Sequence, residues 1–447
     1  MRSALLVLAV VGLSAGIASA DKIKQIVVEE NTKTTADTVE LIAKIEVGDD
    51  WTPDMSEKVK ADLVSSGLFK YVEVFWENVP GGIRVRIQVR DKHSWVIAPA
   101  FYTQPTNIGG GVGFGENNLF GLNQKMLLYG QIATGDSFFV GAWVIPAIGG
   151  TRFYAQFDTY LKSGRNIEYE APQSYLSNPK PVRESRIAYL NGGFRLGVEL
   201  FRGFKIDTRL RGARVSYKNV KLADGAMIED VTGDATSDPT MIPKPGAEGW
   251  DVSNEWALTI DRRANWYGIA EGYKLTATFE HSTPSLGSDF DYRLISMSFY
   301  RAIKVLERHN LIFRVSAAAG YHLPFQQELL TGGTSMRGWL NNQFRGDARA
   351  IGNVEYSFPI FPTIGGLSIR GLMFFDSAYT TFLTVSNPQR NYLPESDVRG
   401  LDGFKNSVGV GTRLYLRQIV LPLLGLDFGY GLEARDYQIY LAIGLTD

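Results

Sequence analysis

The chain has 447 residues, of which 46 are Lys or Arg and 47 are Asp or Glu, for a formal net charge of −1. This balance excludes the basic footprint of a nucleic-acid-binding protein, and the lack of cysteine excludes a small secreted domain stapled by disulfides. The 47 glycines and 12% aromatic residues suit a β-rich protein with many tight turns, whereas the hydrophobic fraction of 45% does not separate soluble from membrane proteins.

A secretory signal peptide is predicted over residues 1–20. Arg2 supplies the positive start, residues 5–17 form an apolar core, and Ala-Ser-Ala at 18–20 offers a small-residue cleavage site. The alternative is an N-terminal membrane anchor, but the apolar run is shorter than the roughly 20 residues that a spanning helix needs. No later stretch is long and charge-free enough for such a helix, so any membrane role falls to a β-barrel.

Residues 21–92 alternate between strand and helix signals. A strand is predicted over 23–28. Asp37 and Glu40 then have the spacing of a capping box, which predicts a short helix that ends at Gly48. The first part of this region is therefore expected to fold as strand and then helix.

A second helix is predicted to begin at Thr52, which acts as N-cap ahead of Pro53 at the first helical position. Gly67 is its expected end. Two strands follow at 71–76 and 83–89, the second with apolar and polar residues in strict alternation. The resulting order is β-α-α-β-β in a small α+β domain.

The remainder, residues 93–447, repeats strand-length segments with one apolar and one polar face. In 404–417, for example, Val408 and Val410 share one face, and Lys405 and Arg413 share the other. This is the pattern of strands that face lipid outside and a lumen inside. A soluble β-sandwich would show the same alternation, but the signal peptide and the aromatic apolar faces favour a membrane protein.

The fold class predicted is a sixteen-stranded antiparallel transmembrane β-barrel that follows the small domain. The strands are expected to begin near residues 94, 107, 121, 136, 151, 185, 204, 250, 270, 290, 308, 346, 366, 404, 423 and 436. Four long polar links, 164–184, 220–249, 323–345 and 381–403, all fall on one side of this barrel. If the N-terminal domain is periplasmic, these long links face outside, and the opposite links are short, as is typical of periplasmic turns.

The small domain resembles a POTRA domain. The similarity includes Ser-Gly-Leu-Phe at 66–69 before the second predicted strand, while Glu30-Asn31 stands where the family usually has Gly-Asn. Strand and helix order alone would fit other small α+β domains equally well. The resemblance implies an exposed sheet edge to which a client strand can be added through backbone pairing.

The barrel resembles the BamA/TamA superfamily of outer-membrane assembly factors. Four segments carry the similarity: Glu-Asn-Asn-Leu-Phe-Gly at 116–121, Gly-Gly-Thr-Ser-Met-Arg-Gly-Trp at 332–339, Asn-Val-Glu-Tyr-Ser-Phe-Pro at 353–359 and Phe-Phe-Asp-Ser-Ala at 374–378. The second segment matches the family's Val-Arg-Gly-Phe/Tyr motif, which lies in the long loop between strands eleven and twelve.

The resemblance implies that this loop folds into the lumen and that Arg337 pairs with Asp376. Met336, Gly338 and Trp339 complete the motif. The strand pattern supports the pairing independently, because Asp376 lies on the polar face of its strand, and a carboxylate inside a barrel favours an arginine partner.

The family's first and last strands meet at a seam that is thought to open laterally for a client strand. Pro99 in the first strand cannot donate a ladder hydrogen bond, which would weaken this seam, unless its nitrogen faces a non-bonded position. The candidate seam residues are Trp95, Ile97, Pro99 and Phe101 in the first strand and Ile439, Leu441 and Ile443 in the last.

No enzyme, cofactor or metal site is predicted. The glycines at 109–115 do not fit a nucleotide-binding register, and His93, His281, His309 and His322 lack metal-ligand spacing. Arg-Gly-Asp at 345–347 matches an adhesion tripeptide, which we regard as a chance match.

The function expected is an outer-membrane assembly factor, located in the outer membrane, that receives unfolded β-barrel clients and templates their insertion. Expected partners are those clients, outer-membrane lipids and periplasmic chaperones or accessory lipoproteins. The alternatives are a polypeptide-translocating pore of the two-partner-secretion type and a lipid-handling barrel. Translocating pores usually carry two POTRA domains and a plugging helix, and a single POTRA domain is expected here.

Overall fold

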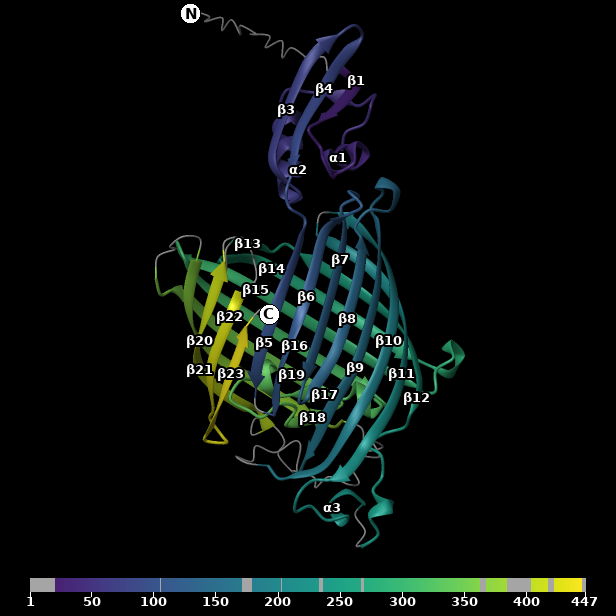
Figure 1. The fold of residues 1–447 in the computed structure, drawn as a ribbon, viewed down its shortest axis with the longest axis vertical. Helices are drawn as coiled ribbons and strands as arrows, with labels where there is room; N and C mark the ends of the chain where they lie inside the picture. The colour runs from purple at the N-terminus through teal and green to yellow at the C-terminus, as the bar shows by residue number, and fades with distance from the viewer. Residues whose placement is uncertain are drawn as a thin grey trace, which may run out of the picture. The chain divides into compact units, whose positions relative to one another are not determined.

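The computed structural model describes residues 21–104, 106–170, 179–201, 203–232, 236–266, 269–361, 367–383, 403–416 and 422–443. The chain divides into two compact units, one of residues 1–94 with 118–123 and one of residues 95–117 with 124–447 (Figure 1). The predicted signal peptide, residues 1–20, lies outside the described residues.

The first unit is a four-stranded sheet with two helices. Its elements are β1 (Asp21–Glu29), α1 (Ala36–Ala43), β2 (Asp50–Trp51), α2 (Met55–Ser65), β3 (Phe69–Val79) and β4 (Gly82–Asp91). The sheet order is β2-β1-β4-β3, with β1 parallel to β4 and β3 antiparallel to it. The predicted β-α-α-β-β order is confirmed. The two-residue strand β2 was not predicted, because two residues are too few to show an alternating pattern.

The core of this unit lies between the sheet and the helices. Alternate residues of β4 point into it, which explains the regular spacing of its apolar residues. The fully or nearly fully buried members are Ile23, Val39, Ala43, Ile45, Trp51, Val59, Leu63, Leu68, Phe69, Val72, Ile83, Val85, Ile87 and Val89. None of the helices in the described part of the chain is long and apolar enough to cross a membrane.

The first helix boundary predicted from the sequence was wrong. The N-cap of α1 is Thr35, whose hydroxyl accepts from the backbone nitrogen of Thr38 at 3.2 Å, so Asp37 lies in the first turn. The helix ends at Lys44, which adopts a left-handed φ of 55°, and does not continue to Gly48. Several cap-forming residues stand in a row here, so the sequence does not determine which of them caps the helix.

The start of the second helix was also misplaced. It begins at Met55 with Asp54 as N-cap, two residues after the predicted cap Thr52. Its end agrees with prediction, because Gly67 follows directly with a φ of 74°.

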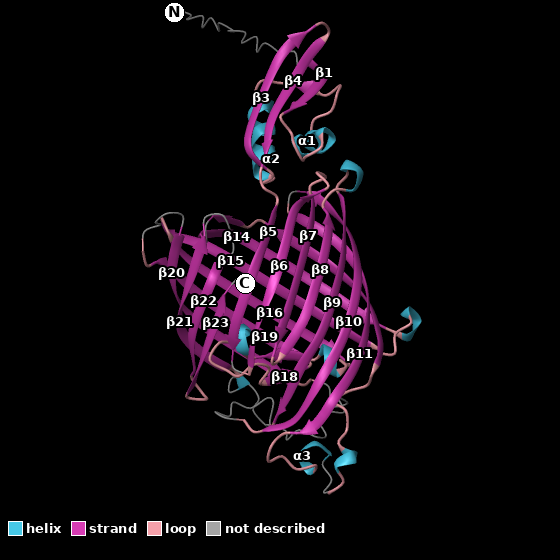
Figure 2. Ribbon diagram, viewed as in Figure 1, coloured by secondary structure: helices cyan, strands magenta, loops and turns pink. Residues whose placement is uncertain are grey.

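The second unit is a closed barrel in which all the described strand pairs are antiparallel, and its described residues form the sixteen predicted strands (Figure 2). They are β5 (Trp95–Gln104), β6 (Asn107–Leu119), β7 (Gln124–Ala133), β8 (Asp136–Ile145), β9 (Phe153–Tyr169), β10 (Pro181–Phe201), β11 (Phe204–Leu222), β12 (Gly249–Asp261) continued by β13 (Ala264–Trp266), β14 (Ile269–Ser282), β15 (Tyr292–Leu306), β16 (His309–Tyr321), β19 (Ala348–Pro359), β20 (Leu367–Thr381), β21 (Lys405–Leu416), β22 (Pro422–Gly431) and β23 (Asp436–Ile443).

Short helical turns lie in the connections. They are η1 (Ile148–Gly150), α3 (Glu229–Thr232), η2 (Pro239–Met241) and η3 (Pro284–Leu286). The predicted link 164–184 was too long, because β9 and β10 run through most of it and leave only residues 170–180 between them. The predicted link 381–403 falls almost wholly outside the described residues.

Alternate residues of the barrel strands separate by chemistry, as the two-residue period predicted. Large apolar side chains such as Phe157, Leu190 and Trp256 are exposed on the outer face. The inward positions carry charged residues that pair across neighbouring strands, for example Arg195 with Asp207 at 2.5 Å. The barrel therefore has an apolar exterior and a charged interior.

Candidate functional site

The connection between β16 and β19 folds into the interior of the barrel. It contains η4 (Phe325–Gln327), β17 (Leu329–Thr331), η5 (Gly333–Ser335) and β18 (Phe344–Gly346), and β17 pairs with β18 as a small antiparallel hairpin. Met336 and Phe344 are completely buried. We call residues 322–347 the internal loop. It connects the eleventh and twelfth barrel strands, which is the position that the resemblance of the Met-Arg-Gly-Trp motif implied.

Arg337 at the turn of the internal loop binds Asp376 of β20. Its Nε donates to Oδ2 and its Nη2 to Oδ1, each at 2.9 Å, and its backbone nitrogen donates to Oδ2 at 3.2 Å. The guanidinium also lies 3.4 Å from the centroid of the Phe374 ring. Asp376 is fully buried. The pairing that the resemblance implied is thus present, in the two-pronged geometry that suits arginine and a carboxylate.

Further charges surround this pair. Arg337 Nη1 lies 3.4 Å from Glu355 and 3.5 Å from Asp427. Asp427 is bound in turn by Arg413 at 2.5 Å, and Glu355 lies 3.6 Å from Arg314. Three arginines and three carboxylates therefore balance one another. Among the described residues no group of His, Asp and Glu is arranged to hold a metal ion.

Gly338 lets the internal loop lie directly against the barrel wall. Its φ is 92°, and a Cβ at this position would come within 2.8 Å of the backbone nitrogen of Gly431 on β22. The contact is closed by Tyr440 of β23, whose hydroxyl accepts from Gly338 N at 3.1 Å and donates to the carbonyl of Trp339 at 2.8 Å. Only glycine fits both the backbone conformation and this close approach.

A second arginine fixes the other end of the internal loop. Arg345 of β18 lies 3.1 Å from Glu168 of β9 and 3.0 Å from Glu328. Glu168 is also held by Arg183 of β10 through two hydrogen bonds of 2.5 and 2.7 Å. All four side chains are at most 4% exposed. The Arg-Gly-Asp triplet at 345–347 is thus buried structure.

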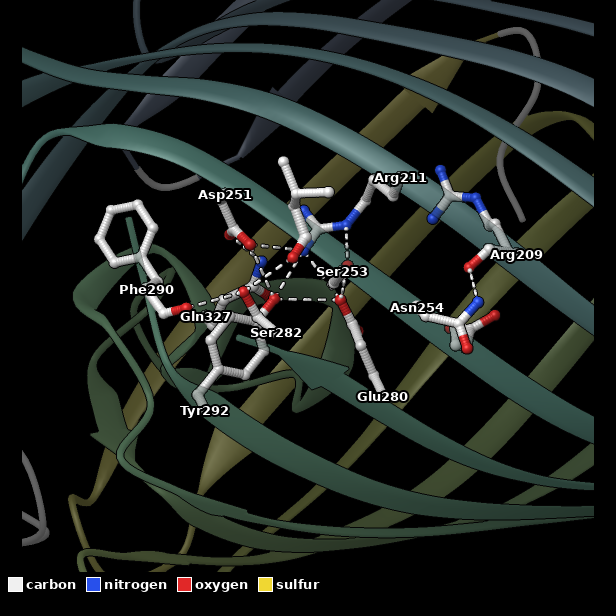
Figure 3. Close-up of polar contacts among 12 residues, drawn as sticks. Arg209, Arg211, Asp251, Ser253, Asn254, Glu280, Ser282, Phe290, Tyr292 and Gln327 are labelled. Atoms are coloured by element: carbon white, nitrogen blue, oxygen red, sulfur yellow. Dashed lines mark hydrogen bonds and ion pairs between the residues drawn. The ribbon is translucent and has the colours of Figure 1, made fainter. Parts of the chain in front are cut away.

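A third contact joins the loop to β11, β12, β14 and β15 (Figure 3). Arg211 lies at the centre of this network and donates from Nη2 to Asp251, Glu280 and the Tyr292 hydroxyl at 3.2, 2.8 and 2.6 Å. Gln327 of the internal loop donates to the other oxygen of Asp251 at 3.0 Å. The loop is therefore bound to three sectors of the wall.

Two of these sectors face each other. In the ring of sixteen strands, β9, which carries Glu168, and β20, which carries Asp376, are eight positions apart in either direction. The internal loop therefore bridges opposite walls of the barrel. Sequence reasoning placed Arg413 on a polar face but missed Asp427, Tyr440, Glu168 and Arg345 as contacts, because these pairings depend on how the ring closes.

The barrel closes where β23 meets β5. The described register contains three residue pairs, Leu441 with Thr103, Ala442 with Tyr102 and Ile443 with Phe101. Within the described part of β23, residues 436–440 have no partner in β5, whereas all of Asp436–Ile443 pair with β22. Pro99 lies within β5, opposite Val112 of β6. The other predicted seam residues, Trp95, Ile97 and Ile439, lie on the same two strands and are exposed on the outer face.

A closed sixteen-strand antiparallel ring with an apolar exterior and an internally braced, charged interior defines a transmembrane β-barrel. The family model described as the Omp85 superfamily domain matches residues 118–446. The chain belongs to the Omp85 superfamily, which places it in the outer membrane among insertion and transport proteins, and the predicted BamA/TamA resemblance is confirmed.

Solved structures share this fold. BamA from Haemophilus ducreyi lacking POTRA domains 1–3 matches with a TM-score of 0.67 and 14% identity, over 95% of this chain and 84% of that one. CdiB from Acinetobacter baumannii matches with a TM-score of 0.64 and 12% identity, over 96% and 74%. CdiB from Escherichia coli matches with a TM-score of 0.53 and 12% identity, over 99% and 94%. No curated protein matches the sequence.

Proposed function

We propose that this protein is an outer-membrane assembly factor that inserts client β-barrel proteins through the seam between β5 and β23. The observation that supports the proposal is the partial pairing of the described part of β23: residues 436–440 have no register partner in β5, whereas the same residues are all paired with β22. A strand that lacks partners over part of its length separates at a lower cost in free energy. The barrel is therefore expected to open here before it opens elsewhere, and an open edge pairs with an incoming strand.

The N-terminal unit supplies a second edge. We propose that it is a POTRA domain in the periplasm that receives unfolded clients. Strand β3 is at the end of its sheet, paired with β4 on one side. Tyr71, Phe75 and Trp76 on β3 are between 41% and 50% exposed. An edge strand with exposed aromatic side chains suits the addition of an apolar client strand.

The internal loop favours insertion over transport through the lumen. Arg337 and Arg345 hold it between opposite walls, where it narrows the interior. A polypeptide passing through the lumen would first have to break both buried clusters, whereas opening the seam leaves them intact. Client folding supplies the free energy, through strand pairing and burial of apolar surface, so no nucleotide is required.

A disulfide across the seam tests this function. The chain contains no cysteine, so Thr103→Cys with Leu441→Cys, a registered pair, introduces one link between β5 and β23. The matched control, Thr103→Cys with Ile108→Cys, links β5 to β6, which stay paired during insertion. We expect the oxidised seam variant to lower the levels of many outer-membrane barrels and reduction to restore them, while the control behaves as the parent does.

Depletion of the protein separates the remaining functions. Broad loss of barrels from the outer-membrane proteome supports assembly, whereas loss of one exported polypeptide supports the translocating pore. An oxidised seam variant that sustains normal barrel levels contradicts lateral insertion. The orientation is tested by protease treatment of cells, because a periplasmic N-terminal unit is cleaved only after the outer membrane has been permeabilised.

A further inference from the structure

The outer face of the barrel carries a groove over β8, β9, β10 and β11. Its volume is about 480 Å³, and most of the surface that lines it is apolar. The strand register explains why a groove forms here. On the outward face, three neighbouring rows of side chains run across these strands, and the middle row is made of small residues.

The membrane-side row consists of bulky side chains. It runs through Phe139, Leu161, Leu190, Arg214 and Trp250. The middle row runs through Ser137, Ser163, Ala188 and Ser216. The third row runs through Arg165, Arg186 and Lys218. Because the serines and the alanine are much shorter than their neighbours, the middle row forms the floor of the groove.

The strand lengths place this groove at a membrane boundary. Counted from the ends at Phe201 of β10 and Phe204 of β11, Leu190 and Arg214 lie eleven and ten residues along their strands. A barrel strand crosses the hydrocarbon layer in about 9–11 residues. Trp250, whose ring lies 5.8 Å from the Arg214 guanidinium, fits the aromatic belt at such a boundary. The bulky row therefore lies at the edge of the acyl chains and the basic row lies at headgroup level.

The basic side chains beside the groove are only partly neutralised within the described part of the protein. The neighbouring acid, Glu184, is already bound by Arg165 at 2.6 Å and by Lys221 at 3.5 Å. Arg186 donates to the carbonyl of Ser163 at 3.0 Å. Within the described ranges, no carboxylate forms an ion pair with Arg186 or Lys218. Glu248, which Lys244 binds at 2.6 Å, is the acid that interacts electrostatically with Arg214. Arg186 and Lys218 thus remain without an ion-pair partner beside an apolar groove, and Arg214 shares one carboxylate with Lys244.

We propose that this groove binds a membrane lipid that carries a phosphate group. The phosphate lies against Arg186, Arg214 and Lys218, and one acyl chain lies along the small-residue floor beside Leu161 and Leu190. Arginine forks suit phosphate oxygens, and uncompensated cations at a membrane surface attract anionic lipids. The inference rests on the proposed function only in the choice of leaflet. If the N-terminal unit is periplasmic, the bound lipid belongs to the outer leaflet.

Native mass spectrometry of the purified full-length protein tests the proposal. The protein is released from micelles doped with phosphatidylglycerol, with diphosphoryl lipid A or with zwitterionic phosphatidylcholine. We expect one phosphatidylglycerol or lipid A molecule to be retained in preference to phosphatidylcholine, and the lipid retained better identifies the headgroup class. Each cation removed should lower retention about fivefold, so Arg186→Gln with Lys218→Gln should lower it about 25-fold.

Two further variants make the test specific. Ala188→Leu fills the floor without a change of charge, and we expect it to lower retention of both phosphorylated lipids. Arg301→Gln removes an outward arginine near the opposite end of β15, beside Tyr273, and should leave retention unchanged. Each variant is first checked for the heat-modifiable gel mobility of a folded barrel, so that a loss of retention is not due to misfolding.

Equal retention of phosphatidylcholine and phosphatidylglycerol overturns the proposal, as does unchanged binding by the Arg186 and Lys218 double variant. Retention of inorganic phosphate with no retention of either phosphorylated lipid would also overturn it, because the groove would then hold no acyl chain. These readouts need neither client insertion nor seam opening. Failure of the lipid site therefore leaves the assembly function standing, and failure of the seam cross-link leaves the lipid site standing.

Discussion

Arg345 of the internal loop lies 3.1 Å from Glu168 of β9, on the wall opposite the Arg337–Asp376 pair. Seven residues lie between the two arginines, so this short segment joins walls that are eight strands apart in the ring. A barrel wall is hydrogen-bonded along its strands but has no direct support across its interior. The two arginines provide that support across the interior, and under the proposed function they would hold the rest of the cylinder in place during opening of the seam.

Removal of the first arginine should weaken the barrel. Arg337→Ala leaves Asp376 buried without its cation, and breaking a buried ion pair in this way costs about 3–5 kcal/mol. Urea unfolding in detergent, followed by tryptophan fluorescence, measures the loss. Arg337→Lys retains the charge but loses the two-pronged geometry, so an intermediate value is expected. A transition at the parent's urea concentration for Arg337→Ala would contradict a bracing role.

The second pair is best measured by a double-mutant cycle. We expect Arg345→Ala and Glu168→Gln to show a coupling free energy of about 1–3 kcal/mol, because the two side chains share one buried network. The control is the Lys205–Glu199 pair, whose side chains are 40% and 39% exposed at a separation of 3.8 Å. That pair should contribute less than about 1 kcal/mol. Equal coupling free energies in the two cycles would contradict the conclusion that Arg345 and Glu168 attach the internal loop to the barrel wall.

Gly338 should not tolerate a side chain. Gly338→Ala combines a φ of 92° with a Cβ placed 2.8 Å from Gly431 N, and such strain costs about 1–3 kcal/mol. The expected result is a loop that leaves the wall, detected as faster proteolysis within 322–347. Gly352→Ala on β19 is the matched control, because its Cβ would meet nothing within 4 Å. Indistinguishable cleavage in the two variants would show that the close approach is not required.

The segment of the N-terminal unit that donates hydrogen bonds to Asp91 should lose stability at acid pH. Burial raises the pKa of the Asp91 carboxyl, but hydrogen bonds from the Thr34 hydroxyl and from the backbone nitrogens of Lys33, Thr32 and Thr34 outweigh this and lower it overall. The folded state therefore favours the carboxylate. Its contribution to stability is complete above the unfolded pKa of about 3.9 and is lost as the pH falls through the lower folded value.

Hydrogen exchange measures this effect at the three donated amides, Thr32, Lys33 and Thr34. After correction for the pH dependence of the intrinsic exchange rate, protection should stay constant from neutral pH down to about pH 4. Below that pH it should decline. Asp91→Asn should weaken protection at all pH values and abolish its pH dependence. Protection that declines between pH 7 and pH 5 would place the responsible group elsewhere.

Local patterns were sufficient to predict most of the fold. The two-residue period and the turn residues located all sixteen strands to within a few residues, because each strand must put apolar side chains outward and polar ones inward. The same rule placed Asp376 inside the barrel. Helix ends were less predictable, since Thr35 and Asp37 can both cap a helix and only the three-dimensional path of the chain selects one.

The sequence by itself determined which residues face inward and which loop carries the Met-Arg-Gly-Trp segment, because both depend on neighbours in the chain. Only the tertiary structure decided which inward charges meet. Glu168 and Arg345 are 177 residues apart, and they come together only because sixteen strands close with one particular stagger and the internal loop crosses the interior. The outer groove has the same origin, since its small-residue floor exists only where Ser163, Ala188 and Ser216 align across three strands.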